Sequence, residues 1–193
     1  MKVNICKWLS LFAIGVMMLV VAGCAPSTKS PVFAPSPVYV SLSTPYKLQP
    51  ISNEMSRREF YVVTGQHKDE AFSFQLAVNI GDGVMTVIGL TPVGQDLFSI
   101  SYDGAQVRYK ALFDALPIRP TYLLADLQFL LCDMATIQAG FWQPGVVVEQ
   151  LDGMRLIRDR QRELVRIEWD PVSGDMMLEQ MIHHYTYTFK RVS

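Results

Sequence analysis

Few side chains in this sequence could act as a catalytic nucleophile, a base or a metal ligand. The chain has three histidines and three cysteines. His183 and His184 are adjacent, so in a strand they would point to opposite faces and could not readily share a metal ion. The motifs G-x-S-x-G, H-E-x-x-H and C-x-x-C do not occur in the sequence. We therefore predict no catalytic residues, no metal site and no cofactor.

The first 23 residues have the three parts of a secretory signal peptide, in the usual order. Lys2 and Lys7 supply positive charge, residues 8–20 form an apolar run, and small residues follow. The run is too short to remain as a helix across a bilayer core of about 30 Å. We therefore predict that residues 1–23 are cleaved off and that the mature chain begins at Cys24.

The end of this segment, Val21-Ala22-Gly23-Cys24, resembles the lipobox of bacterial lipoproteins, in which the cysteine carries acyl chains. Several acyl chains on one residue anchor a protein stably, whereas a single chain binds a membrane only marginally. Residue 25 is Ala and not Asp, which by resemblance to the usual sorting rule implies the outer membrane. We predict lipidation at Cys24 and a domain that faces the periplasm. The alternative is an ordinary secreted protein with an incidental cysteine.

The net charge of the chain limits which kinds of partner the sequence supports. The chain has 17 basic and 18 acidic residues, and removal of Lys2 and Lys7 leaves 15 against 18, a formal charge of −3. This balance gives no reason to expect a nucleic acid partner.

With Cys6 cleaved off and Cys24 acylated, Cys132 is the remaining thiol, so no intrachain disulfide can form. We interpret Cys132 as a small buried hydrophobe, with a reactive thiol as the alternative.

Prolines concentrate between residues 25 and 50, where they alternate with Ser and Thr. Each proline removes a backbone donor and restricts the residue before it, which disfavours a helix or a central strand. We predict that residues 24–52 form the lipidated cysteine and a Pro-rich tether. One domain is then predicted over residues 53–193.

Beyond Glu54 the sequence has short alternating segments between turn residues, which is typical of an antiparallel sheet. The clearest strand covers residues 72–80, with Phe72, Phe74, Leu76, Val78 and Ile80 on one face. Further strands are predicted over residues 84–90, 96–101, 106–110, 146–151, 155–158, 163–169, 177–182 and 185–190.

Between the two groups of strands, leucines fall at three- and four-residue spacing over residues 123–131, after Pro120. This spacing predicts an amphipathic helix. A large antiparallel sheet with one strong helix can close into a barrel, or curl partway and leave the opening to helices. We predict a mainly β (α+β) fold, an incomplete antiparallel β-barrel with covering helices.

Three stretches carry a resemblance to a known family. Residues 89–100, GLTPVGQDLFSI, resemble the strand, Pro-Leu-Gly loop and strand of the outer-membrane lipoprotein receptor LolB. Residues 116–120, LPIRP, with the helix after them, resemble its short connection and helix. With the tail IHHYTY at residues 182–187, the chain resembles LolB-like lipoproteins that are often encoded beside aryl-polyene or fatty-acid-type biosynthetic genes. The resemblance implies a LolA/LolB-like half barrel whose apolar inside accommodates acyl chains.

The resemblance also implies a role for one loop residue. In the receptor, an apolar residue at the tip of the Pro-Leu-Gly loop protrudes and is implicated in membrane insertion of cargo. The matching residue is Val93, which offers less apolar area by about one methylene, or roughly 0.8 kcal/mol. The alternative is an ordinary hairpin residue between the turn formers Pro92 and Gly94.

Apolar residues of the strands and the helix are the candidate ligand-binding residues. In a half barrel they would line the space between sheet and helix. They are Phe72, Phe74, Leu76, Val78, Leu124, Leu127, Leu131, Trp169, Tyr185 and Tyr187. In a closed core the same residues simply pack, and periodicity does not separate the two arrangements.

One cluster of charge lies around a predicted hairpin, where Arg155, Arg158, Arg160, Arg162 and Arg166 fall within twelve positions. Such a cluster could meet lipid phosphates or an acidic partner. We favour a solvated strand face, because acidic residues are interspersed and cancel much of the charge.

The leading hypothesis is a non-catalytic outer-membrane lipoprotein that binds or transfers a lipid-like or acylated molecule in the periplasm. Its partners would be the membrane, through the lipid anchor, the ligand, and a periplasmic carrier or envelope exporter. The second hypothesis is an accessory lipoprotein with a closed core, which contacts an envelope protein complex. The third is an envelope hydrolase acting on acyl esters, which the missing motifs disfavour.

Overall fold

The computed structural model describes residues 30–67, 70–111 and 119–192, and the unit considered below begins at Pro31. The predicted signal peptide, Cys24 and residues 116–118 of the predicted connection lie outside the described residues. The strands are β1 (Val32–Phe33), β2 (Val38–Ser41), β3 (Thr44–Tyr46), β4 (Arg57–His67), β5 (Glu70–Gly81), β6 (Val84–Leu90), β7 (Asp96–Tyr102), β8 (Val107–Ala111), β9 (Val146–Leu151), β10 (Met154–Asp159), β11 (Arg162–Trp169), β12 (Met176–Gln180) and β13 (Tyr185–Arg191). The helices are α2 (Pro120–Leu131) and α3 (Met134–Ala139).

One antiparallel sheet of 11 strands makes up most of this unit. Its strand order is β1-β8-β7-β6-β5-β4-β13-β12-β11-β10-β9, and β2 pairs with β3 as a separate hairpin. The end strands β1 and β9 do not pair with each other, so the sheet is not closed into a barrel. The predicted mainly β fold, with an incompletely closed antiparallel sheet and helices, is thus confirmed.

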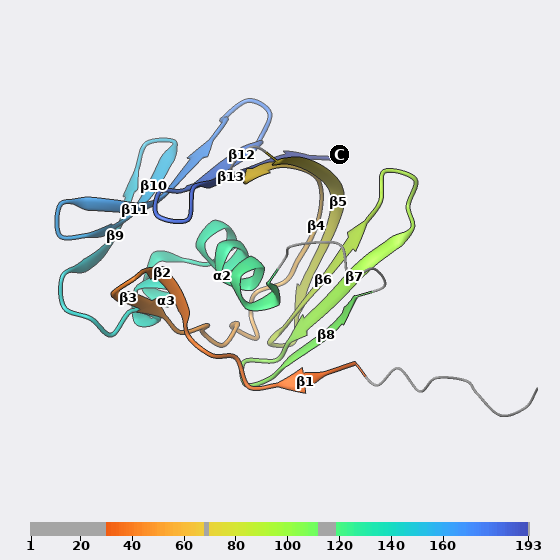
Figure 1. Cartoon of the computed structure of the whole chain (residues 1–193), viewed down its shortest axis with the longest axis horizontal. Coiled ribbons are helices and arrows are strands. Elements are labelled where there is room, and N and C mark those ends of the chain that lie inside the picture. The colour runs from red at the N-terminus through yellow and green to blue at the C-terminus, as the bar shows by residue number, and fades with distance from the viewer. Residues whose placement is uncertain (1–29, 68–69, 112–118, 193) are drawn as a thin grey trace, which may run out of the picture. The chain divides into compact units, whose positions relative to one another are not determined.

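Helix α2 lies on the concave side of the curled sheet, with β4 to β8 on one side and β9 to β13 on the other (Figure 1). The face of β5 that carries Phe74, Leu76, Val78 and Ile80 is buried, whereas the residues between them are half-buried or exposed. This alternation is the one that the sequence predicts for residues 72–80. It gives the sheet an apolar inner face for the helix to cover.

The helix differs from its prediction in one respect. Every residue from Leu123 to Leu131 is buried, including Asp126 and Gln128, so the expectation of an amphipathic helix is wrong. A helix that only covered a sheet would expose one face to water. Here the hairpin β2–β3 also contacts α2, which encloses the helix on its remaining side.

The hairpin β2–β3 lies within residues 24–52, and the predicted tether is therefore wrong from Pro31 onward. Val38, Val40, Tyr46, Leu48 and Ile51 are all buried in the apolar core. Gln128 fixes the segment, because its Oε1 accepts hydrogen bonds from Tyr46 Oη (2.7 Å) and Gln49 N (3.0 Å).

The physical reason for this error lies in where the prolines fall. Pro45 lies on a two-stranded ladder, opposite Tyr39, where a missing donor is tolerated. The apolar residues between the prolines, among them Val38, Val40 and Tyr46, are buried in the core, so the folded domain starts before residue 53.

The predicted strands after residue 80 agree with β6 to β13 within two residues at each end. The turn between β5 and β6 consists of Asp82 and Gly83, whose positive φ values of 52° and 74° suit a two-residue hairpin loop. Strands β1 and β4, the hairpin β2–β3 and helix α3 were not predicted from the sequence. His183 and His184 lie in the turn between β12 and β13 and not in a strand.

Tyr46 tests whether the N-terminal hairpin is part of the folded core. Its ring lies 4.6 Å from that of Phe129 and 4.9 Å from that of Phe141, between centroids. We expect Tyr46→Ala to lower the free energy of unfolding by about 3–5 kcal/mol, measured by urea denaturation. Leu42→Ala, at a hairpin tip that is 96% exposed, is the control and should stay within about 0.5 kcal/mol of wild type. Equal, small effects of both would mean that the segment is a tether after all.

Candidate functional site

The predicted ligand-binding residues all belong to, or pack against, one apolar cluster. The buried ones are Phe74, Leu76, Val78, Leu124, Leu127 and Leu131. The partly buried ones are Phe72, Trp169, Tyr185 and Tyr187. The first group packs the interior in this structure. A ligand would meet the second group first, because these side chains still reach the surface.

Aromatic rings from the sheet and the helix form a continuous row at the border of this cluster. Along the row, ring centroids are 5.7 Å apart for Phe72 and Tyr187, 5.0 Å for Tyr187 and Tyr185, and 6.3 Å for Tyr185 and His183. Tyr122 of α2 continues it at 5.6 Å from His183. These separations lie in the range of favourable aromatic pairs, so the row ties β5 and β13 to the start of α2.

Asp126 places a carboxyl group inside the apolar core. Its Oδ2 accepts a hydrogen bond from Tyr185 Oη at 2.8 Å, and its Oδ1 accepts one from Gln180 Nε2 at 3.2 Å. Burial raises the pKa of Asp126 to about 7, although both hydrogen bonds act in the opposite direction. Burial and the neighbouring Asp126 also hold the pKa of Tyr185 well above its usual range. The helix is therefore joined to β12 and β13 through a carboxyl group that titrates near neutral pH.

A pocket of about 620 Å³, which we call the inner pocket, opens at the C-terminal end of α2. Its apolar wall consists of Ile51, Met55, Leu130, Leu131, Cys132 and Trp169. Leu131 and Trp169 are two of the predicted ligand-binding residues. The volume falls within the range of about 300–1,000 Å³ typical of small-molecule sites.

Arg155, from β10, also lines the inner pocket and is buried. Its Nη1 donates to the carbonyl oxygens of Phe129 (2.6 Å) and Cys132 (2.9 Å), which satisfies the last turn of α2. Its guanidinium also lies 5.3 Å from the centre of the Trp169 ring, at the distance of a cation–π contact. The arginine cluster expected from the sequence is thus divided, because Arg158 and Arg166 pair with Glu163 while Arg155 faces the helix.

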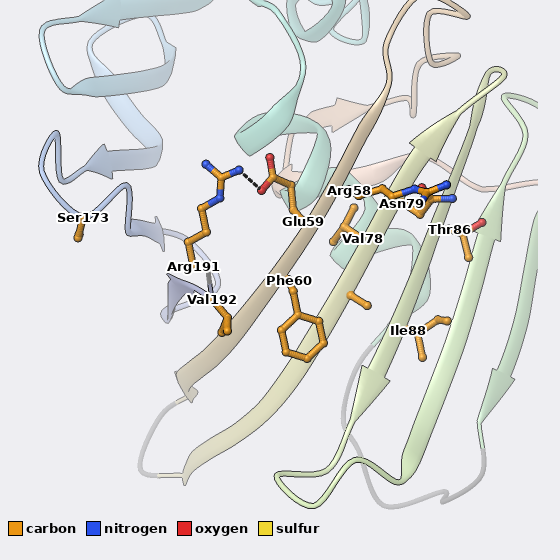
Figure 2. Close-up of a pocket in the computed structure, with 11 residues that line it drawn as sticks. Arg58, Glu59, Phe60, Val78, Asn79, Thr86, Ile88, Ser173, Arg191 and Val192 are labelled. Atoms are coloured by element: carbon orange, nitrogen blue, oxygen red, sulfur yellow. Dashed lines mark ion pairs between the residues drawn. The ribbon is translucent and has the colours of Figure 1, made fainter.

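A second depression, which we call the outer groove, has a volume of about 850 Å³. It is lined by side chains of β4, β5 and β6 and by the C-terminal Arg191 and Val192, as Figure 2 shows. None of its residues lines the inner pocket. Of the predicted ligand-binding residues, Val78 is the one that borders it.

Val93 lies at the tip of the loop between β6 and β7 and is 82% exposed. Backbone hydrogen bonds from Thr91 N to Gln95 O (2.8 Å) and from Gly94 N to Thr91 O (2.9 Å) hold the loop. The loop therefore presents an apolar side chain to solvent on a fixed turn.

In the described part of the chain, no hydrogen bond joins a serine or cysteine side chain to a histidine. Burial raises the pKa of the Cys132 thiol to about 11, which disfavours the nucleophilic thiolate. His183 Nε2 contacts the carbonyl oxygen of Tyr39. Over the described residues, no group of three or more His, Cys, Asp or Glu side chains could hold a metal ion.

Residues 62–193 match the family model described as "Protein of unknown function (DUF3261)". The chain belongs to this family. The match begins inside β4 and runs through both helices to β13, so β1 and the hairpin β2–β3 precede it. No curated protein matches the chain. Within the described residues of this DUF3261 protein, no helix is long and apolar enough to cross a membrane.

Sequence reasoning missed the polar residues that organise the interior of this DUF3261 protein. Asp126 and Gln128 stand between leucines in the helix, and a lone acidic and a lone amide residue in such a run signal buried hydrogen bonds. Arg155 gave no comparable signal, because its partners are backbone carbonyls far away in the sequence.

Asp126 should make stability depend on pH. Its pKa is near 3.8 in an unfolded chain and about 7 in the folded protein, so the folded state binds the proton more tightly. Stability is then full below about pH 4 and is lost as pH rises through 7. We expect Asp126→Asn to unfold at nearly the same urea concentration as wild type at pH 3.5 and at a higher one at pH 8. The gain at pH 8 is expected on the order of a few kcal/mol, because each unit of difference between the two pKa values corresponds to about 1.4 kcal/mol.

Asp152→Asn, in the exposed turn between β9 and β10, is the matched control and should behave alike at both pH values. If Asp126→Asn and Asp152→Asn show the same pH profile, Asp126 does not titrate in this range.

Proposed function

We propose that this protein is a non-catalytic outer-membrane lipoprotein, anchored through Cys24, that binds or transfers a lipid-like or acylated molecule in the periplasm. The proposal includes a LolA/LolB-like half barrel as the scaffold. It requires no cofactor, and its further partner would be a periplasmic carrier or an envelope exporter. The following paragraphs give the support for each part.

The observation that carries the proposal is the inner pocket. The antiparallel sheet curls around one apolar helix without closing, and at the C-terminal end of that helix it leaves about 620 Å³ beside Leu131 and Trp169. An acyl chain is flexible and apolar, so a pocket with Leu, Met, Ile and Trp walls suits it. The rest of the lining, which includes Glu54 and Arg57, is polar and would meet the polar end of the ligand.

The proposed anchor keeps the domain close to the membrane. Seven residue steps separate Cys24 from Pro31, where the folded unit begins. A fully extended chain covers at most about 3.6 Å per residue, so these steps reach no farther than about 25 Å. The first residue of the folded unit would therefore lie within that distance of the acylated Cys24.

One observation favours the alternative of an accessory lipoprotein with a closed core. Six predicted ligand-binding residues, among them Leu124 and Leu127 of the helix, are buried in the packed interior. If the interior stays closed in solution, the protein would act through its surface on an envelope complex. The two functions differ in whether the domain binds an amphiphile at all.

Met55 offers a test of the inner pocket, because it lines the pocket and is only partly buried. We expect Met55→Trp to fill the pocket and to lower the affinity for a fluorescent fatty acid about tenfold. Met177→Trp on β12, which lines neither pocket, is the control and should bind like wild type. Retained fatty acid affinity in Met55→Trp, measured at the pocket through the backbone amide shift changes of Leu131 and Trp169 and accompanied by a normal melting transition, would rule out this pocket as the space that the ligand fills. Absence of binding in the wild type would favour the accessory role.

Val93 tests delivery separately from binding. We expect Val93→Glu to leave fatty acid binding and stability unchanged, because the side chain is 82% exposed. Transfer of the bound fluorescent fatty acid to liposomes should slow, since a charged tip enters the bilayer interface less readily. Val172→Glu, at the 94% exposed tip between β11 and β12, is the matched control. Equal transfer rates for the two variants would remove Val93 from the mechanism.

A further inference from the structure

The outer groove is lined by two neighbouring rows of side chains that cross β4, β5 and β6 (Figure 2). The residues of these rows alternate with the buried ones along each strand, so they lie on the face opposite the core. The solvated face of an antiparallel sheet is commonly polar. This one carries an apolar row beside a polar row.

The apolar row consists of Phe60, Ala77 and Ile88. Phe60 is the register partner of Ala77, and Ala77 is the register partner of Ile88, so the three form a line across the strands. Val192 extends this line, because its backbone N–H donates to Phe60 O at 2.9 Å. Together they give the groove an apolar floor.

The polar row consists of Arg58, Asn79 and Thr86, which are also direct register partners. It runs two residues away from the apolar row, or about 7 Å along the strands. All three side chains can donate hydrogen bonds. Arg58 is exposed, and it forms no ion pair with any residue in the described ranges.

The other arginine of the groove has a partner. Arg191 Nη2 lies 2.8 Å from Glu59 Oε2, as the dashed line in Figure 2 marks. Glu59 and Arg191 belong to the other face of the sheet, since their register partners are the buried Val78 and Tyr61. The uncompensated positive charge of the groove therefore lies on Arg58, beside Asn79 and Thr86.

We propose that the outer groove binds an anionic amphiphile, a molecule with a carboxylate or phosphate head and an apolar body. The head would bind to Arg58, whose guanidinium matches the oxygen pairs of both anions, with Asn79 and Thr86 as further donors. The apolar body lies along Phe60, Ala77 and Ile88. A volume of about 850 Å³ suits one small molecule. This site shares no residue with the inner pocket and does not depend on the function proposed for it.

The test uses the mature chain with Cys24→Ala, so that no acyl group of the protein competes. Laurate, dodecyl phosphate and dodecanol serve as probes, because they share the alkyl chain and differ in the head. Binding is located by the backbone amide chemical shifts of Ala77 and Ile88 and measured by titration. We expect both anions to bind about tenfold more tightly than dodecanol, since charged hydrogen bonds are the stronger ones.

Two variants separate the contributions of the rows. Arg58→Gln should lower the affinity for laurate and dodecyl phosphate about tenfold and leave dodecanol unchanged. Ile88→Asn should weaken all three probes. Arg162→Gln, an exposed arginine on β11, is the matched control and should bind like wild type. In Met55→Trp, the probes should change the amide chemical shift of Ala77 as much as they do in wild type, which distinguishes this site from the inner pocket.

Three outcomes would overturn the proposal. The first is that no probe changes the backbone amide chemical shifts of Ala77 and Ile88. The second is that Arg58→Gln and Arg162→Gln bind laurate and dodecyl phosphate with equal affinity. The third concerns the source of the anion. If inorganic phosphate alone binds as tightly as dodecyl phosphate, the groove holds a free anion and the apolar row has no part in recognition.

Discussion

The structure depends on burying residues 123–131 of α2 on all sides while the polar side chains among them, Asp126 and Gln128, keep hydrogen-bond partners. Unpaired polar groups inside a protein cost on the order of 1–3 kcal/mol each. Asp126 bonds with Tyr185 and Gln180, Gln128 bonds with Tyr46 and Gln49, and Arg155 serves the carbonyls of the last turn. These partners come from three separate parts of the chain. The helix therefore fixes where the C-terminal strands, the N-terminal segment and β10 must lie.

This requirement limits where a ligand can go. Moving α2 away from the sheet would break hydrogen bonds at Asp126, at Gln128 and at the Arg155 cap together, so the helix is held as a unit. Space for a ligand is easiest to provide beyond the end of the helix, where the chain turns from Leu131 into α3. The inner pocket lies there. Deprotonation of Asp126 would destabilise the folded state, because burial disfavours the carboxylate more than the hydrogen bonds from Tyr185 and Gln180 favour it.

The parts of the fold that follow from local pattern could be predicted from the sequence, and the parts that follow from distant contacts could not. The strict alternation in β5 and the leucine spacing in α2 are local, and both elements formed as expected. The prolines before residue 50 suggested a tether because proline rules are local too. The contacts of Tyr46 and Leu48 with the core depend on the position of α2, which no local pattern contains. The helix was expected to expose one face because the hairpin β2–β3, which covers that face, was not predicted.

The same distinction applies to the two candidate sites. The predicted ligand-binding residues were chosen by apolar periodicity, and periodicity selects the inner face, where most of them pack. The outer groove requires that Phe60 stand opposite Ala77 and that Ala77 stand opposite Ile88. That register is set by the turn at Asp82 and Gly83 and by the pairing of β4, a strand without a clear sequence signal.

The two sites place different demands on a ligand, and this follows from the sheet that separates their residues. The inner pocket has two arginines and two acidic residues at its border, so charge gives little selection and apolar shape must decide. The outer groove has one arginine without a carboxylate partner next to an apolar row, so charge and shape select together. An alternating strand exposes each face to a different environment, and a single sheet can carry both kinds of site without either one altering the core.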